Sequence, residues 1–201
     1  MNKKQNIMDL NLELPDHGAM PDDLKKYFEV CKEKLGLVPN VLAAYSHEDE
    51  QLRAFSRFYN SIMFAETGLS PLEREMIAVA VSSRNHCFYC LTAHGAAVRE
   101  LSQDPELGEA IAMNHRAADI SQKQKSMLDF AVKLTDHPDE VEHSDRESLR
   151  KSGFSEKQIW DIANVASFYN MTNRVASAVD MKPNREYHYK CREKKTSKDK
   201  Q

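Results

Sequence analysis

Apolar residues recur along this chain at the three- and four-residue spacing of helices, and no stretch alternates apolar and polar residues strongly enough to predict a strand. The clearest helix starts are three capping boxes, in which a serine is followed three residues later by glutamate or glutamine. They begin at Ser70, Ser121 and Ser155, and Pro71 strengthens the first because proline favours the first helical position. The pattern predicts an all-α helical bundle.

The predicted helices follow one another between residues 21 and 189, which we expect to form a single all-helical domain. Glycines at positions 36 and 68 are expected to end two of the early helices, and the polar stretch at 102–105 is expected to end the central one. Residues 1–20 carry little helical periodicity and are predicted to form an extended N-terminal arm. Residues 190–201 are rich in lysine and nearly devoid of apolar residues, so we predict a disordered basic tail.

Two stretches of the sequence are similar enough to indicate a weak internal repeat of a helix pair. Aligning Ser155 with Ser70 places the apolar residues 162–163 over 77–78. The alternative is that these are two independent amphipathic helices with similar caps. The second copy lacks the candidate catalytic residues of the first copy. Glu75, Cys87, Cys90 and His94 align with Trp160, Thr172, Val175 and Val179. We therefore expect the catalytic residues to come from the first copy only.

Composition narrows the class of protein. The chain has 201 residues, a formal net charge of −3 and a pI near 6.2, which argues against a nucleic-acid surface. No uncharged apolar run approaches the ~18 residues of a membrane span, and the first residues lack the apolar core of a signal peptide, so a cytoplasmic protein is expected. Four cysteines that include a Cys-x-x-Cys fit a reducing compartment and a redox or metal site.

The candidate chemistry lies at Cys87, Cys90 and His94. If the segment after Asn85 is helical, these three side chains share one face, because residues three and four apart are neighbours on a helix. Asn85 is predicted as the N-cap, which places both sulfurs close to the positive end of the helix dipole. A cysteine in this position can have a pKa of ~3.5–7.5 instead of ~8.5, so we predict a reactive thiolate.

Glu75 lies on the preceding predicted helix, twelve residues before Cys87. If the two helices pack as neighbours, its carboxylate can approach His94 and form a Glu–His–Cys proton relay. The spacing alone does not establish this approach, because two helices joined by a short break can splay apart. Tyr89 and Phe88 are candidates for the entrance to the site, although packing in the core explains them equally well.

Glu75, Cys87, Cys90 and His94, with the stretches 35–42, 69–81 and 168–174, resemble the signature of the alkylhydroperoxidase D-like proteins, in the peroxidase-related branch of the carboxymuconolactone decarboxylase superfamily. The resemblance extends over roughly residues 10–189 and implies an all-helical, usually oligomeric fold. It further implies that Cys90 attacks a hydroperoxide, that Cys87 resolves it as a disulfide, and that Glu75 and His94 relay protons. One position departs from the pattern, because Tyr89 stands where well-studied members carry a histidine between the cysteines.

The expected function is therefore a thiol-dependent peroxidase that acts on a small hydroperoxide, needs no cofactor and is regenerated by a dithiol reductant or redox adaptor protein. We also expect a homo-oligomer that binds neither nucleic acid nor a membrane. One alternative is a zinc protein with Glu75, Cys87, Cys90 and His94 as ligands, which we disfavour because three of these ligands crowd one helical turn. A second alternative is a redox-responsive binding protein with little turnover. The cysteines do not support a lactone decarboxylase-type activity.

Overall fold

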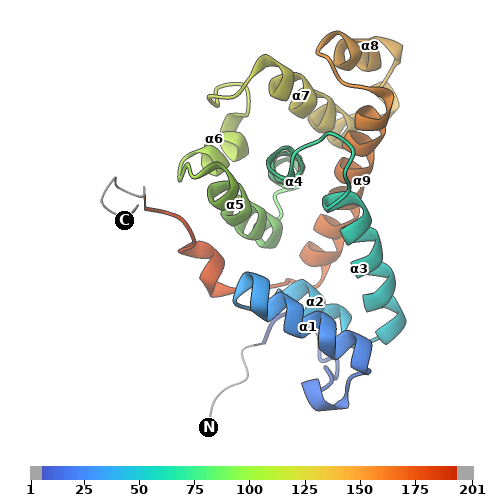
Figure 1. Cartoon of the computed structure of the whole chain (residues 1–201), viewed down its shortest axis with the longest axis vertical. Coiled ribbons are helices and arrows are strands. Elements are labelled where there is room, and N and C mark those ends of the chain that lie inside the picture. The colour runs from blue at the N-terminus through green and yellow to red at the C-terminus, as the bar shows by residue number, and fades with distance from the viewer. Residues whose placement is uncertain (1–5, 194–201) are drawn as a thin grey trace.

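The computed structural model describes residues 6–193, and within this range every regular element is a helix. The prediction of an all-α fold is confirmed. Helix α4 passes through the middle of the molecule and contacts α5, α6, α7 and α9, which surround it (Figure 1). The described elements are η1 (His17–Ala19), α1 (Asp22–Leu35), α2 (Asn40–Tyr45), α3 (Asp49–Met63), α4 (Pro71–Arg84), α5 (Phe88–Ser102), α6 (Leu107–Asn114), α7 (Gln122–Asp136), η2 (Pro138–Glu140), α8 (His143–Lys151), α9 (Glu156–Ala178) and η3 (Arg185–His188).

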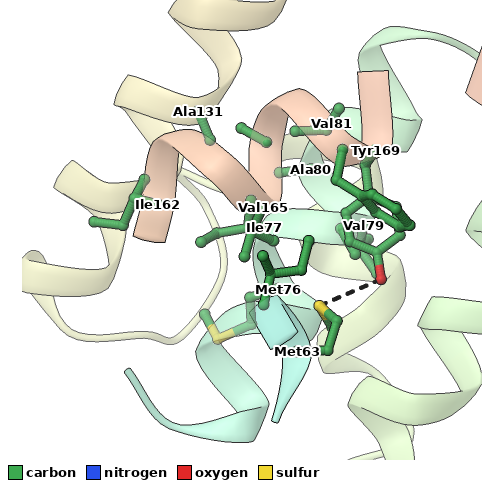
Figure 2. Close-up of a cluster of buried hydrophobic side chains, with 14 of the residues drawn as sticks. Met63, Met76, Ile77, Val79, Ala80, Val81, Ala131, Ile162, Val165 and Tyr169 are labelled. Atoms are coloured by element: carbon green, nitrogen blue, oxygen red, sulfur yellow. Dashed lines mark hydrogen bonds between the residues drawn. The ribbon is translucent and has the colours of Figure 1, made fainter. Parts of the chain in front are cut away.

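Helix α4 is central because its sequence is apolar on nearly every side. Residues 76–81 are each at most 1% exposed, and Figure 2 shows Ile77 and Val81 among side chains from α7 and α9. A helix that is apolar all round is stable only when other elements cover it. Its start is fixed by the predicted capping box, in which Ser70 and Glu73 bond reciprocally. This buried helix fixes the position of Glu75, which it carries.

The junction between α4 and α5 differs from the sequence prediction. Asn85 is the C-cap of α4, His86 adopts the left-handed conformation with φ 51°, and Cys87 is the N-cap of α5. The prediction of Asn85 as N-cap is therefore wrong by two residues. The Asn85 side chain instead donates hydrogen bonds to Asn170 and Asn173 on α9. Partners distant in sequence thus hold this junction, and a local pattern could not reveal them.

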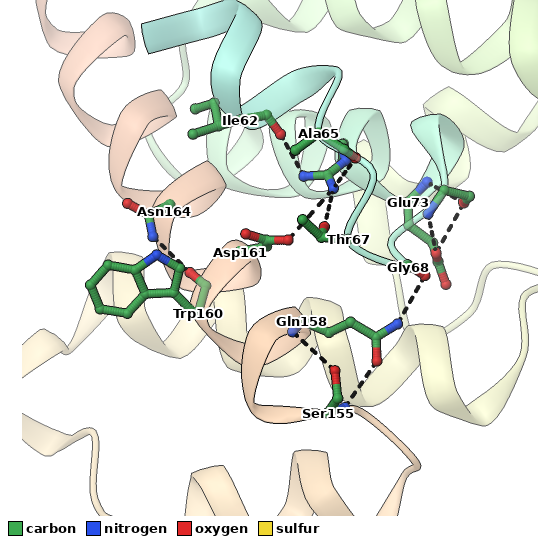
Figure 3. A network of polar contacts seen from close by, with 12 residues as sticks. Ile62, Ala65, Thr67, Gly68, Glu73, Ser155, Gln158, Trp160, Asp161 and Asn164 are labelled. Carbon is green, nitrogen blue, oxygen red and sulfur yellow. Dashed lines mark hydrogen bonds and ion pairs between the residues drawn. The ribbon is translucent and has the colours of Figure 1, made fainter.

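A buried arginine links α4 to the end of α3 and the loop that follows it. The Arg74 guanidinium donates to the backbone oxygens of Ile62 and Ala65 and to the hydroxyl of Thr67, and it lies 3.6 Å from Asp161 on α9 (Figure 3). Nearby, the Gln158 side chain donates to the backbone oxygen of Gly68. These bonds fix the start of α4 against the start of α9.

Two features of the second half differ from the sequence pattern. The predicted second copy of the helix pair is one unbroken helix, α9, which runs through the position that aligns with the α4–α5 junction. Helix α8 was not predicted, because it is almost wholly polar and buries only Leu149. Its start is nevertheless capped by Glu142 and Asp145.

The two ends of the described chain pack against the helices. The N-terminal arm includes the short helix η1 and bonds through its backbone to the segment after α9. Asp9 N donates to Val179 O, and Lys182 N donates to Ile7 O. At the other end, Arg99 of α5 donates to the backbone oxygens of Tyr187 and Lys190. Lys190, the first residue of the predicted disordered tail, also pairs with Glu100 of α5, and Arg192 pairs with Glu109 of α6. Residues 194–201 of the tail lie outside the described residues, as do residues 1–5 of the arm.

None of the helices between residues 6 and 193 combines the length and the apolar character needed to cross a bilayer.

Candidate active site

The structure brings Glu75 and His94 together. His94 Nδ1 lies 2.6 Å from Glu75 Oε2, within a strong hydrogen bond, so the predicted approach of the carboxylate to the imidazole is confirmed. Helices α4 and α5 achieve this by packing along each other. The edge of the Tyr169 ring fixes the imidazole from another side, with ring centroids 4.5 Å apart. The imidazole is thus held in one orientation by a carboxylate and an aromatic ring.

The two sulfurs lie at the very start of α5. Cys87 is the N-cap and Cys90 is three residues on, and both are free thiols that are almost completely buried. The pKa of Cys87 is lowered to about 6, chiefly because the Cys90 thiol donates a hydrogen bond to its sulfur. The pKa of Cys90 is raised, because it is that donor and because it is buried. At rest, therefore, the pair carries its negative charge on Cys87 and its proton on Cys90.

A cavity of about 510 Å³ adjoins this dithiol. Cys90, His94 and Glu75 line it, whereas Cys87 is not among its lining residues. Most of the wall is apolar or aromatic, including Phe55 and Phe168. The cavity is large enough for an organic molecule, and its wall includes one sulfur of the dithiol, that of Cys90, beside the carboxylate–imidazole pair.

Comparison with known proteins bears on this arrangement. A crystal structure of an uncharacterized peroxidase-related protein from Silicibacter sp. TM1040 is similar over 96% of this chain and 100% of that one, with 57% sequence identity and a TM-score of 0.90. A second structure, described as an alkylhydroperoxidase AhpD core from Ralstonia eutropha JMP134, is 37% identical over 95% of this chain and 100% of that one, also with a TM-score of 0.90. This chain belongs to the alkylhydroperoxidase D-like proteins of the carboxymuconolactone decarboxylase superfamily.

The carboxymuconolactone decarboxylase family model itself matches residues 49–119, which include the whole of α4 and α5. No functionally curated protein matches the chain. The debrominase Bmp8 has the same fold at only 18% identity, with a TM-score of 0.76 over 90% of this chain and 96% of that one.

The two aromatic candidates of this alkylhydroperoxidase D-like site have different positions. Tyr89 lines the cavity, and its hydroxyl accepts a hydrogen bond of 3.0 Å from the backbone N–H of Val41 on α2. Phe88 points elsewhere: it is 61% exposed, and its ring lies against His188. Of the two, only Tyr89 can contact a molecule in the cavity.

Sequence reasoning missed the contribution of α9 to this alkylhydroperoxidase D-like site. Tyr169, Thr172 and Asn173 surround the sulfur and the imidazole, and Tyr169 and Thr172 line the cavity. These residues lie in the stretch 168–174, which resembles the family signature. The sequence alone gave no function for any residue of that stretch. We expected no catalytic residue from the second copy because the four positions that align with Glu75, Cys87, Cys90 and His94 hold other residues. That comparison did not consider the residues beside those positions.

The zinc alternative and Cys31 can also be compared with the structure of this family member. Within residues 6–193 no three His, Cys, Asp or Glu side chains are grouped as ligands for a metal ion. Cys31 of α1 is buried, and burial raises the pKa of its thiol. It also lines the cavity that holds Cys90.

Proposed function

We propose that this chain is a cysteine peroxidase that reduces organic hydroperoxides, with Cys90 as the attacking sulfur. The observation that carries the proposal is that Cys90 lines the same cavity as a carboxylate–imidazole pair, with a second cysteine three residues away. Such a pair can accept the thiol proton and return it to a leaving group. The apolar wall favours an organic hydroperoxide over hydrogen peroxide.

The reaction starts with the loss of the Cys90 proton to His94, whose protonated ring the Glu75 carboxylate stabilises. The Cys90 thiolate attacks the distal oxygen, the O–O bond breaks, and the sulfur becomes a sulfenic acid. The alcohol leaves with the proton from His94. The Cys87 thiolate then attacks the sulfenic sulfur, the S–O bond breaks, a disulfide forms, and the hydroxide leaves as water after taking a proton from solvent. An external dithiol returns both cysteines to thiols and is itself oxidised to a disulfide.

Cys87 is suited to the second step rather than the first. Its low pKa makes it a thiolate near neutral pH, ready to attack a sulfenic acid. Cys87 does not line the cavity, and it lies in a buried cluster that includes Met8 of the N-terminal arm and Met181 of the segment after α9. A hydroperoxide in the cavity therefore meets Cys90 first.

Single-turnover measurements on serine variants test this division of roles. Cys90→Ser should abolish hydroperoxide consumption, whereas Cys87→Ser should consume one equivalent and leave a sulfenic acid at Cys90 that dimedone traps. Cys191→Ser is the matched control, because this cysteine does not line the cavity, and it should behave as wild type. The reverse pattern would exchange the two roles, and equal consumption by all three variants would contradict the proposal.

A further inference from the structure

Placing a negative charge on Cys90 is the difficult step of the proposed reaction. The sulfur is buried, and the adjacent Cys87 thiolate opposes a second charge beside it. The site therefore needs hydrogen-bond donors that favour the anion on Cys90, the sulfur that faces the cavity. The backbone N–H of Cys90 itself bonds to the Cys87 sulfur and so favours the charge on Cys87.

Asn173 of α9 is a buried amide that is held in one orientation. It is 1% exposed, and its Oδ1 accepts a hydrogen bond of 2.9 Å from Asn85 Nδ2. The same Asn85 nitrogen donates to Asn170 Oδ1 at 3.0 Å, which fixes Asn85 as the donor. With its oxygen turned to Asn85, Asn173 directs both N–H bonds the other way. One of them is donated to Ser82 Oγ at 3.0 Å. Hydrogen bonding from the Asn173 amide lowers the pKa of Cys90 and so opposes the effect of burial.

Thr172 precedes Asn173 on α9 and lies on the cavity side of the same sulfur. Its hydroxyl donates to the backbone oxygen of Tyr169 at 3.3 Å, a long bond, and it also lies within hydrogen-bonding reach of Cys90. A hydroxyl has one hydrogen and can turn it to the better acceptor. A thiolate is a stronger acceptor than a backbone carbonyl already bonded within a helix, so the hydroxyl should turn to Cys90 when the proton leaves.

We propose that Asn173 and Thr172 form a donor pair that stabilises the thiolate of Cys90, the sulfur that faces the cavity, once its proton has passed to His94. The inference rests on the proposed function in taking Cys90 as the reactive thiol. Both donors oppose the effect of burial, which raises the pKa of Cys90. Helix α9 thus supplies the two side-chain hydrogen-bond donors to Cys90.

The test is the pH dependence of Cys90 alkylation by iodoacetamide, followed by peptide mass mapping in a Cys87→Ser background. This background removes the coupled thiol, and serine is a favoured N-cap residue, so α5 keeps its start. Thr172→Val preserves shape and removes only the hydroxyl, and Asn173→Ala removes the amide. Each variant should lower the alkylation rate at pH 7 by about tenfold and raise the pH midpoint by about one unit, as expected for a lost hydrogen bond to a charged group.

Two variants supply matched controls. Thr92→Val removes a hydroxyl of α5 that bonds to the backbone oxygen of Phe88, and Asn164→Ala removes an amide of α9 that bonds to that of Trp160. Both should leave the alkylation curve unchanged. A curve for Thr172→Val and Asn173→Ala that superimposes on that of the parent would overturn the donor pair. If Asn173→Ala fails to fold by circular dichroism, Thr172→Val alone decides.

The same measurement separates this inference from the proposed function, because alkylation needs no hydroperoxide. If the alkylation curves shift but the protein does not consume hydroperoxide, the result contradicts the peroxidase function and supports the donor pair. If hydroperoxide is consumed normally but the alkylation curves do not shift, the result contradicts the donor pair and supports the peroxidase function.

Discussion

Cys87 and Cys90 differ in their charge although they are three residues apart on one helix. The N-cap position and the hydrogen bond from Cys90 favour a thiolate at Cys87, whereas the same hydrogen bond and burial disfavour one at Cys90. The sequence predicted a reactive thiolate at this helix start. It could not show which sulfur carries the charge, because that depends on the exact N-cap and on donors from α9.

The ionisation of Cys87 can be followed by thiolate absorbance at 240 nm. With Cys31 and Cys191 replaced by serine, we expect one thiolate per chain to appear with a midpoint of about pH 6, since the group is ionised above its pKa. Cys90→Ala should raise this midpoint, because it removes the hydrogen bond that lowers the pKa. Cys87→Ser should remove the step. A first ionisation only above pH 8 would contradict the assignment.

Glu75 should act through His94. Glu75→Gln keeps the size of the side chain but removes the charge that stabilises a protonated imidazole. Proton transfer from Cys90 becomes less favourable, so peroxidase turnover should fall by about tenfold or more, and the pH midpoint of Cys90 alkylation should rise.

Glu73→Gln is the control for this change. It lies on the same helix and is exposed, and glutamine can replace glutamate in a capping box, as Gln124 does after Ser121. It should leave both curves unchanged. If Glu75→Gln behaves like Glu73→Gln, the carboxylate serves the structure of α4 and not the reaction.

At the scale of elements, the buried Arg74 holds the start of α4 in place. Arg74→Gln would leave Asp161 without its nearest cation and three acceptors without their donor, so we expect a loss of roughly 3–5 kcal/mol in unfolding free energy. Arg53→Gln is the control, because Arg53 pairs with Asp23 and Glu50 at the surface, where a loss of only ~0–1 kcal/mol is typical. Chemical denaturation measures both, and similar losses would contradict this role for Arg74.

The elements also show why some helices could be predicted and others could not. Three capping boxes located the starts of α4, α7 and α9, because capping is a local interaction. The junction at Asn85 and the continuity of α9 are set by side chains that meet across the fold. Helix α8 is almost wholly polar and buries only Leu149, so its sequence has too few apolar residues for their spacing to indicate a helix.

At the scale of the whole molecule, the chain leaves an apolar stripe on its surface. Trp160, Met171 and Val175 lie along one side of α9 and are 70%, 42% and 36% exposed. Phe58 of α3 is 45% exposed and packs edge-on against Phe168 beside them. Clustered exposed apolar residues are typical of protein interfaces, which agrees with the expected homo-oligomer.

We therefore predict that light scattering gives a mass above the 23.0 kDa of one chain, and that Met171→Glu lowers it by placing a charge in the stripe. Met113→Glu is the control, because Met113 is 85% exposed on α6 and is not part of the stripe. A monomeric wild-type protein would contradict the expected oligomer, and equal masses for the two variants would exclude the stripe as its interface.

The cavity is also a property of the whole molecule, because α1, α2, α3, α4, α5, α9 and the segment around Tyr187 all contribute to its wall. The sequence identified Cys90, His94 and Glu75 but not the volume between these elements. Only the packing of the complete fold shows that Cys90, rather than Cys87, meets a molecule that enters.

The most direct test of the account is a count of thiols in the anaerobically reduced protein before and after one equivalent of cumene hydroperoxide. The chain has four cysteines, and all four are free thiols in the structure. We predict that two thiols disappear, that the hydroperoxide is consumed, and that peptide mass mapping finds a disulfide between Cys87 and Cys90. Four remaining thiols with the hydroperoxide intact, or oxidation confined to Cys31 and Cys191, would contradict it.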